Sequence, residues 1–199
     1  MSTPVLHLLA GPNGAGKSTL ATRVLVPRTH LPFVNADVIA AERWPEAQLE
    51  HAYEASQVAA QQREWLLASR RSFVTETVFS HQSKIDLVGR AAGAGYLVQL
   101  HVVMVSVEVS VGRVAHRVGR GGHDVPEQKV RDRYDRLWTL VAAACDLADR
   151  TTFYDNSSAR SPYRVVATFD RGRVVGSPCW PAWAPVALTG SAWIRPSLA

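Results

Sequence analysis

The chain has 199 residues, of which 47% are hydrophobic and 20% charged, with a formal net charge of +5. This length predicts one domain with a small appendage at most. No apolar run approaches the 18 residues that span a membrane, and two cysteines, Cys145 and Cys179, are too few for a disulfide framework or a cysteine metal site. The positive charge suits an anionic substrate or nucleic acid, so the placement of the basic residues has to distinguish them.

A glycine-rich loop lies close to the amino terminus, between an apolar segment of strand length (5–10) and a segment that can begin a helix (19–25). Because the apolar segment runs directly into the loop, it is not read as a secretory signal, and we expect a cytoplasmic protein. The loop fits the pattern G-x-x-x-x-G-K-[ST] at every fixed position. Its residues are Gly11, Pro12, Asn13, Gly14, Ala15, Gly16, Lys17, Ser18 and Thr19. The strand–loop–helix context favours a P-loop over a glycine-rich turn that matches by chance.

A P-loop binds the phosphates of a nucleotide for a physical reason. Its glycines let successive N–H groups point into one concavity, and the following helix adds partial positive charge. Lys17 is expected to reach the β- and γ-phosphates, and the Ser18 hydroxyl to ligate Mg²⁺. We therefore expect ATP and Mg²⁺ as cofactors.

Strands and helices are predicted to alternate along the next part of the chain. The predicted strands are 31–34, 72–75, 96–107 and 151–154, and the predicted helices are 46–71, 82–92, 108–118 and one that begins near Pro126 with Asp124 as its cap. Such alternation predicts an α/β fold of the P-loop NTPase, kinase-like type, with a five-stranded, mainly parallel sheet and helices on both faces.

The carboxyl-terminal part has a different character. Segments 163–169 and 173–175 predict a hairpin, and the residues after it are rich in tryptophan and proline. We predict a P-loop kinase core over 1–156, with a Gly/Arg-rich lid at about 113–136, and a hairpin and tail over 157–199 packed on the core. A partner-binding arm is the alternative for the tail.

Two carboxylates follow predicted strands at the edge that carries the P-loop, where ligands of open α/β sheets bind. Asp37 could accept the proton of a hydroxyl that attacks the γ-phosphate, or it could cap the following helix. Glu76 could hold the substrate or orient Mg²⁺, or it could be a surface charge.

Arginines surround the glycine-rich break at 119–122. Three precede the break and three follow it: Arg113, Arg117, Arg120, Arg131, Arg133 and Arg136. Arginines in such a lid could stabilise the charge of a transferred phosphoryl group. The alternative is a solvated basic helix, because Glu127 and Arg131 have the spacing of an i,i+4 ion pair.

Four segments together resemble the zeta toxin family of P-loop kinases, in particular its compact stand-alone members. They are Gly11 to Thr19, Asn35-Ala36-Asp37, Glu76-Thr77-Val78-Phe79-Ser80, and Arg117-Val118 with Gly121-Gly122-His123-Asp124-Val125-Pro126 and Arg131-x-Arg133-Tyr134. The resemblance covers about residues 4 to 156. Leu137 departs from the pattern, and residues 157–199 match no part of it.

The resemblance implies an ATP-dependent kinase of a small-molecule hydroxyl, with a nucleotide sugar such as UDP-N-acetylglucosamine as the acceptor and an antitoxin protein as a partner. The roles that it implies are these: Asp37 as the base, with Lys17, Arg117, Arg131 and Arg133 as catalytic residues; Glu76, Thr77, Ser80 and His123 toward the substrate; Arg120 toward the nucleotide; and Ser18 with Glu76 toward the metal.

Other functions stay open on the sequence alone. The acceptor could be a polynucleotide end, a dinucleotide or an antibiotic, although the predicted lid lacks the interleaved aromatic residues typical of nucleic-acid binding. A nucleotide-dependent switch ATPase would keep the P-loop without an acceptor. Nothing in the sequence points to a membrane partner.

Overall fold

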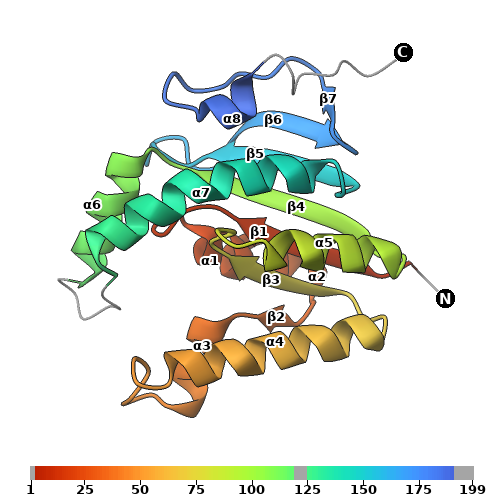
Figure 1. Cartoon of the computed structure of the whole chain (residues 1–199), viewed down its shortest axis with the longest axis vertical. Helices are drawn as coiled ribbons and strands as arrows, with labels where there is room; N and C mark the ends of the chain where they lie inside the picture. Colours follow the sequence, from red (N-terminus) through yellow and green to blue (C-terminus); the bar gives the residue numbers. More distant parts are fainter. Residues whose placement is uncertain (1–2, 119–124, 191–199) are drawn as a thin grey trace.

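A seven-stranded sheet with the strand order β2-β3-β1-β4-β5-β6-β7 forms the centre of the computed structural model, which describes residues 3–118 and 125–190 (Figure 1). The strands are β1 (Val5–Ala10), β2 (Phe33–Val34), β3 (Phe73–Thr77), β4 (Leu97–Met104), β5 (Arg150–Asp155), β6 (Arg164–Asp170) and β7 (Arg173–Val175). Strands β1 to β5 pair in parallel, whereas β6 and β7 are antiparallel to their neighbours.

Helices cover both faces of the sheet. They are α1 (Lys17–Leu20), the π-helical turn η1 (Ala21–Leu25), α2 (Val26–Thr29), α3 (Ala36–Arg43), α4 (Ala52–Ala68), α5 (Ser83–Gly93), α6 (Val107–Val118), α7 (Glu127–Cys145) and α8 (Val186–Thr189). The successive strand residues Leu8 and Leu9 belong to different buried clusters, because neighbouring side chains of a strand point to opposite faces. Leu8 lies in the cluster of α5 and α7, and Leu9 lies in the cluster of α1 and η1 (Figure 1).

The predicted α/β fold is confirmed, but the sheet has seven strands where five were expected. The predicted hairpin is the source of the difference, because β6 pairs with β5 from Arg150–Asp170 to Asp155–Arg164 and so extends the sheet. The contact between β6 and β5 is apolar as well as hydrogen-bonded, since Phe169 of β6 packs edge-on against Phe153 of β5, with 5.7 Å between the ring centroids.

One helix is shorter than predicted. The segment 46–71 contributes a helix only over Ala52–Ala68, since turns precede it. Trp44, just before that segment, stacks on His51 with ring centroids 4.7 Å apart, so the chain folds back on itself before α4 begins. The predicted cap of α7, Asp124, lies outside the described residues.

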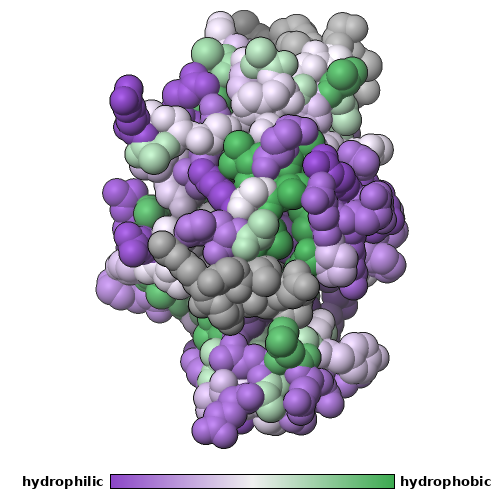
Figure 2. Space-filling model, turned by 90° about the vertical axis from the view of Figure 1, so that its left-hand side faces the viewer, coloured by the Kyte–Doolittle hydropathy of each residue, from purple (hydrophilic) through white to green (hydrophobic). Residues whose placement is uncertain are grey.

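The register of the central strands brings three strand ends together. Ala10 at the end of β1 is paired with Thr77 of β3 and with Val102 of β4, and Val34 of β2 is paired with Thr75. The P-loop and the residues that follow β2 and β3 therefore emerge at one edge of the sheet. Hydrophilic side chains cover much of this face, with smaller hydrophobic areas between them (Figure 2).

Candidate functional site

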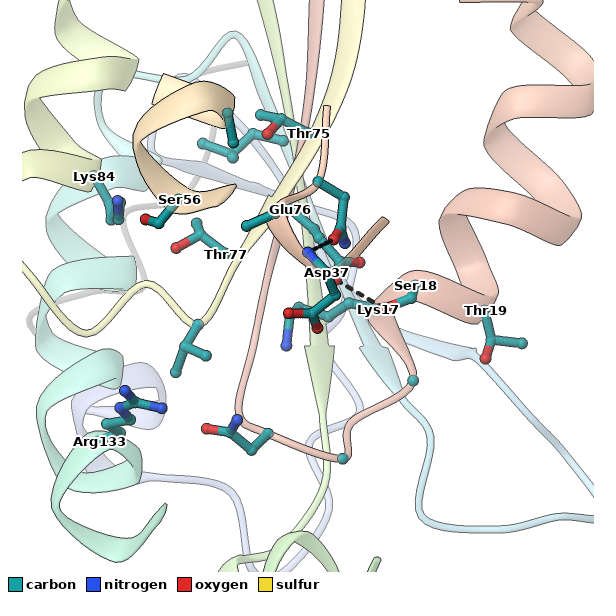
Figure 3. A pocket seen from close by; sticks show the side chains of 18 of the residues that line it. Lys17, Ser18, Thr19, Asp37, Ser56, Thr75, Glu76, Thr77, Lys84 and Arg133 are labelled. Carbon is teal, nitrogen blue, oxygen red and sulfur yellow. Dashed lines mark hydrogen bonds between the residues drawn. The ribbon is translucent and has the colours of Figure 1, made fainter. Parts of the chain in front are cut away.

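A cavity of about 660 Å³ opens at this edge of the sheet. At one end, which we name the loop end, it is lined by P-loop residues: Asn13, Gly14 and Gly16 to Thr19. At the other, the helix end, it is lined by Ser56, Ala59 and Arg63 of α4 and by Lys84 and Leu87 of α5. Asp37 and Thr77 also line it, and Figure 3 shows Asp37 between Ser18 on one side and Ser56 and Lys84 on the other.

The carbonyl oxygens of the P-loop are held from outside the loop. Four side chains each donate to one of four successive carbonyls: Ser110 to Asn13 (2.6 Å), Arg113 to Gly14 (3.3 Å), Asn156 to Ala15 (2.7 Å) and Tyr163 to Gly16 (3.0 Å). The donors come from α6 and from the segment after β5. Carbonyl oxygens fixed in this way are kept away from the concavity, where they would repel an anion.

Gly16 is required by this packing. Its backbone is left-handed, with φ at +98°, and a Cβ placed on it would lie 2.6 Å from the Asn156 amide nitrogen and 2.9 Å from the Tyr163 hydroxyl. A side chain here would therefore both strain the backbone and displace two of the donors that hold the loop.

Lys17 is buried beneath the loop, where its ammonium group donates to the carbonyls of Gly11 (3.0 Å) and Pro12 (2.9 Å). Burial lowers its pKa, and the carboxylates of Glu76 and Asp37 act in the opposite direction. Because a buried charge is poorly screened by water, the ammonium group can attract a phosphate strongly at close range.

The Asp37 carboxylate is not the cap of α3. That position belongs to Asn35, whose Oδ1 accepts hydrogen bonds from the backbone N–H groups of Asp37 (2.6 Å) and Val38 (3.1 Å). The alternative that Asp37 is a helix cap is therefore wrong. Its exposed side chain lines the cavity (Figure 3).

Glu76 lies directly beside the P-loop. Its Oε1 accepts a hydrogen bond from the Ser18 hydroxyl (2.7 Å), and its Oε2 is buried without a hydrogen bond of good geometry, although Asn35 is adjacent. Burial raises the pKa of this carboxyl, while Lys17 and the Ser18 hydroxyl act to lower it. A hydroxyl paired with an incompletely satisfied carboxylate offers the hard oxygen ligands that Mg²⁺ prefers, so these residues fit the predicted metal.

The predicted arginines divide into two groups. Arg117 and Arg133 line the cavity, as does Arg113, which also donates to the carbonyl of Asn156 (2.9 Å). Arg131 is not among the lining residues and forms the i,i+4 ion pair with Glu127, at 2.8 Å. The ion-pair alternative thus describes Arg131, and its catalytic role stays a prediction.

The remaining predicted residues are placed as follows. Thr77 lines the cavity, and its hydroxyl accepts a hydrogen bond from the N–H of Phe79 (3.2 Å). Ser80 is not among the lining residues. Arg120 and His123 lie outside the described residues.

The sequence did not identify several residues that shape the site. Ser110, Asn156 and Tyr163 hold the loop, and Arg63 and Lys84 line the helix end. Asn156 could have been found by the rule that singled out Asp37, because it directly follows a parallel strand. The others lie within helices or loops and follow no motif.

Comparison with known proteins identifies the family. A family model described as "AAA domain" (AAA_33) matches residues 6–138, which is more than half of the chain. The chain belongs to this AAA domain family. The matched residues contain the P-loop, Asp37, Glu76 and the arginines that line the cavity. No curated protein sequence matches the chain.

Solved structures share the fold of this AAA domain. A chain in the crystal structure of AvrRxo1-ORF1:AvrRxo1-ORF2 with sulphate ions is similar over 87% of this chain and 60% of that one, with a TM-score of 0.66 and 20% identity. A chain of the PezAT chromosomal toxin-antitoxin system of Streptococcus pneumoniae is similar over 83% and 72%, with a TM-score of 0.58 and 15% identity. Shikimate kinase from Acinetobacter baumannii in complex with shikimate is similar over 82% and 88%, with a TM-score of 0.50 and 19% identity.

These likenesses show a P-loop kinase-like fold. The chain spans about 60% of the length of the AvrRxo1 chain that it matches. In the described part of the chain, no helix has both the length and the apolar character needed to cross a membrane.

Proposed function

We propose that this AAA domain is an ATP-dependent kinase that transfers the γ-phosphate to a hydroxyl of a small molecule. The observation that carries the proposal is the placement of Asp37. Its carboxylate lines the cavity and is not needed to cap α3, because Asn35 is the cap of that helix. A nucleotide hydrolase or switch has no need of a free base that faces an acceptor, whereas a kinase does.

The residues suggest a division of labour for the reaction. The P-loop and Lys17 bind the phosphates, and Ser18 and Glu76 would hold Mg²⁺, which supplies charge neutralisation at the phosphates when it is bound. The acceptor oxygen forms a bond to the γ-phosphorus while the bond between that phosphorus and the bridging oxygen of ADP breaks. Asp37 takes the proton of the acceptor hydroxyl. Arg117 and Arg133 would stabilise the negative charge on the transferred group.

For the acceptor we propose a nucleotide sugar such as UDP-N-acetylglucosamine. Support comes from the zeta-toxin-like segments that include Glu76, Thr77 and Arg133, and from the fold that the chain shares with a protein of the PezAT toxin-antitoxin system. By the same likeness we propose an antitoxin protein as a partner. The use of ATP is supported by the AvrRxo1-ORF1:-ORF2 structure that contains ATP, which is similar over 92% of this chain with a TM-score of 0.56.

One experiment tests the kinase and its acceptor together. The protein is incubated with ATP, Mg²⁺ and a panel of nucleotide sugars, and the products are examined by mass spectrometry. The expected result is a gain of one phosphate by one member of the panel and none with Lys17→Ala. Parallel reactions offer an oligonucleotide end, a dinucleotide or an antibiotic, and transfer to one of these would refute the nucleotide sugar as acceptor. ATP hydrolysis without any transfer would refute the proposed kinase function.

A further inference from the structure

The helix end of the cavity contains two cations that the reaction does not use. Arg63 and Lys84 are both half-buried and line the cavity, and they come from α4 and α5 respectively. They are close enough for the charge of Arg63 to contribute to lowering the pKa of Lys84, after the larger effect of burial. Two like charges held together at partial burial are unfavourable unless an anion offsets them.

In the described part of the chain, no carboxylate forms an ion pair with either residue. The charge of the neighbouring Glu64 acts to raise the pKa of Arg63, against the larger effect of burial, but the two carboxylate oxygens of Glu64 accept hydrogen bonds of 2.6 Å from Arg90. This contact joins α4 to α5 and leaves the charge of Arg63 on the cavity side.

The positions of both residues on their helices support the same conclusion. Ser56, Ala59 and Arg63 are spaced by three and four residues, so they lie on one face of α4, and this face lines the cavity. Lys84 is in the first turn of α5, where the helix dipole favours a negative charge rather than a positive one. Asp86 in the same turn is exposed and does not line the cavity.

Within the cavity as a whole, cations outnumber carboxylates. The lining cations are Lys17, Arg63, Lys84, Arg113, Arg117 and Arg133, and the lining carboxylates are Asp37 and Glu76. Both carboxylates lie near Lys17, whose pKa they influence. No carboxylate lines the helix end, so the cavity offers Arg63 and Lys84 no negative charge there.

We propose that Arg63 and Lys84 form a binding site for a phosphate or diphosphate group of the acceptor, separate from the P-loop. Two cations match the charge of a phosphate better than the single charge of a carboxylate, and the arginine fork fits a pair of phosphate oxygens. That the phosphate belongs to an acceptor rests on the proposed kinase function, but binding of the anion can be tested without turnover.

Lysine labelling provides the test, because the chain has only three lysines, Lys17, Lys84 and Lys129. The P-loop is first filled with a non-hydrolysable ATP analogue and excess Mg²⁺. An amine-acetylating reagent is then added with and without inorganic diphosphate, and the modification of each lysine is followed by mass spectrometry. We expect diphosphate to slow the modification of Lys84 at least about tenfold, while the exposed Lys129 is unaffected.

Variants and matched probes sharpen the test. Arg63→Gln should raise the diphosphate concentration needed for half protection about tenfold, whereas Arg173→Gln, which removes an equal charge on the exposed surface of β7, should not. Equal protection by acetate at the same ionic strength would overturn the assignment to phosphate. Unchanged Lys84 modification at millimolar diphosphate would overturn the site altogether.

The outcome is distinct from that of the kinase assay. If diphosphate does not protect Lys84 in a protein that phosphorylates its acceptor, the anion site is refuted and the kinase function stands. Protection of Lys84 in a protein that transfers no phosphate would leave the anion site and refute the kinase. If both hold, Arg63→Gln should raise the KM for the acceptor while the KM for ATP stays the same.

Discussion

The two ends of the cavity are built in opposite ways. At the loop end, backbone carbonyls from Gly11 to Gly16 each accept a hydrogen bond from a side chain, so the geometry is fixed by many partners. At the helix end, Arg63 and Lys84 have no carboxylate partner among the described ion pairs. The first end is preorganised for one kind of group, and the second presents charge whose geometry the ligand can complete.

The difference suggests how one fold can serve many acceptors. The binding of nucleotide phosphates depends on a loop and its supports, which are costly to alter because each change affects several hydrogen bonds. In our proposal, recognition of the acceptor depends on single side chains on α4 and α5, whose exchange leaves the hydrogen bonds of the loop in place. Variants of each end should therefore have different effects on the two substrates.

The largest effect is expected at Lys17. Lys17→Ala should lower phosphoryl transfer by about 10³-fold or more, since it removes a positive charge from beside the transferred group in a buried setting. The fold should persist, because the hydrogen bonds of the lysine go to carbonyls of the loop itself and not to the core of the sheet. Turnover and circular dichroism of the purified variant provide the measurement, and unchanged turnover would refute the role of the P-loop in catalysis.

Asp37→Asn tests the base that connects the two ends. The variant keeps the shape of the side chain but cannot take the proton, so acceptor phosphorylation at saturating ATP should fall about 10²–10³-fold. Affinity for ATP and thermal stability should both stay close to wild type, because Asn35 caps α3. As a control, Asn35→Ala should lower the free energy of unfolding by about 1 kcal/mol. Near-normal transfer by Asp37→Asn would leave the chain without its base.

Tyr163→Phe tests whether the outer hydrogen bonds preorganise the loop end. Loss of the hydroxyl that donates to Gly16 should raise the KM for ATP about fivefold and leave the KM for the acceptor unchanged. Tyr154→Phe is the matched control, since its hydroxyl contacts His101 and not the loop. Equal rises in the KM of both substrates would contradict the separation of the two ends.

The smallest effect at neutral pH is expected from His101, in β4 next to the strand that leads into the loop. Its Nε2 lies 3.1 Å from Nδ1 of His7, and burial, helped by the charge of His7, lowers the pKa of His101 to about 3. Below the ordinary histidine pKa of about 6.5, the unfolded chain binds a proton that the folded chain excludes. Stability is therefore lost as pH falls from about 6.5 toward 3.

Denaturant unfolding at pH 7 and pH 5 measures this loss. Between these values His101 should account for about 2 kcal/mol of the decrease in the free energy of unfolding. His101→Gln should show a correspondingly smaller decrease, and His116→Gln, a change at an exposed site, should behave like wild type. An identical pH dependence in all three proteins would refute the assignment.

The sequence predicted those parts of the site that depend on local patterns. The P-loop could be recognised because glycine spacing specifies its backbone, and Asp37 and Glu76 could be found because the ends of parallel strands meet at one edge. Arg63 and Lys84 could not be found in this way. Their meeting depends on how α4 and α5 pack beside each other, through the contact of Glu64 with Arg90.

The same limit applies to the fold. Five strands were predicted from alternation with helices, but the pairing of β6 with β5 is an antiparallel tertiary contact in which Phe169 packs on Phe153. Arg131 illustrates the opposite case, in which a local rule competed with the family pattern. The i,i+4 spacing from Glu127 describes its contact, because the partner lies on the same helix.

The sheet ends on both sides in its two shortest described strands, β2 with two residues and β7 with three. An outer strand offers unpaired N–H and C=O groups to which another chain can add, and the number of such groups grows with its length. The ends of this sheet present too few of them to template a stable intermolecular ladder. The long, apolar strands β1 and β4, which would be prone to aggregation if exposed, are enclosed between neighbours on both sides.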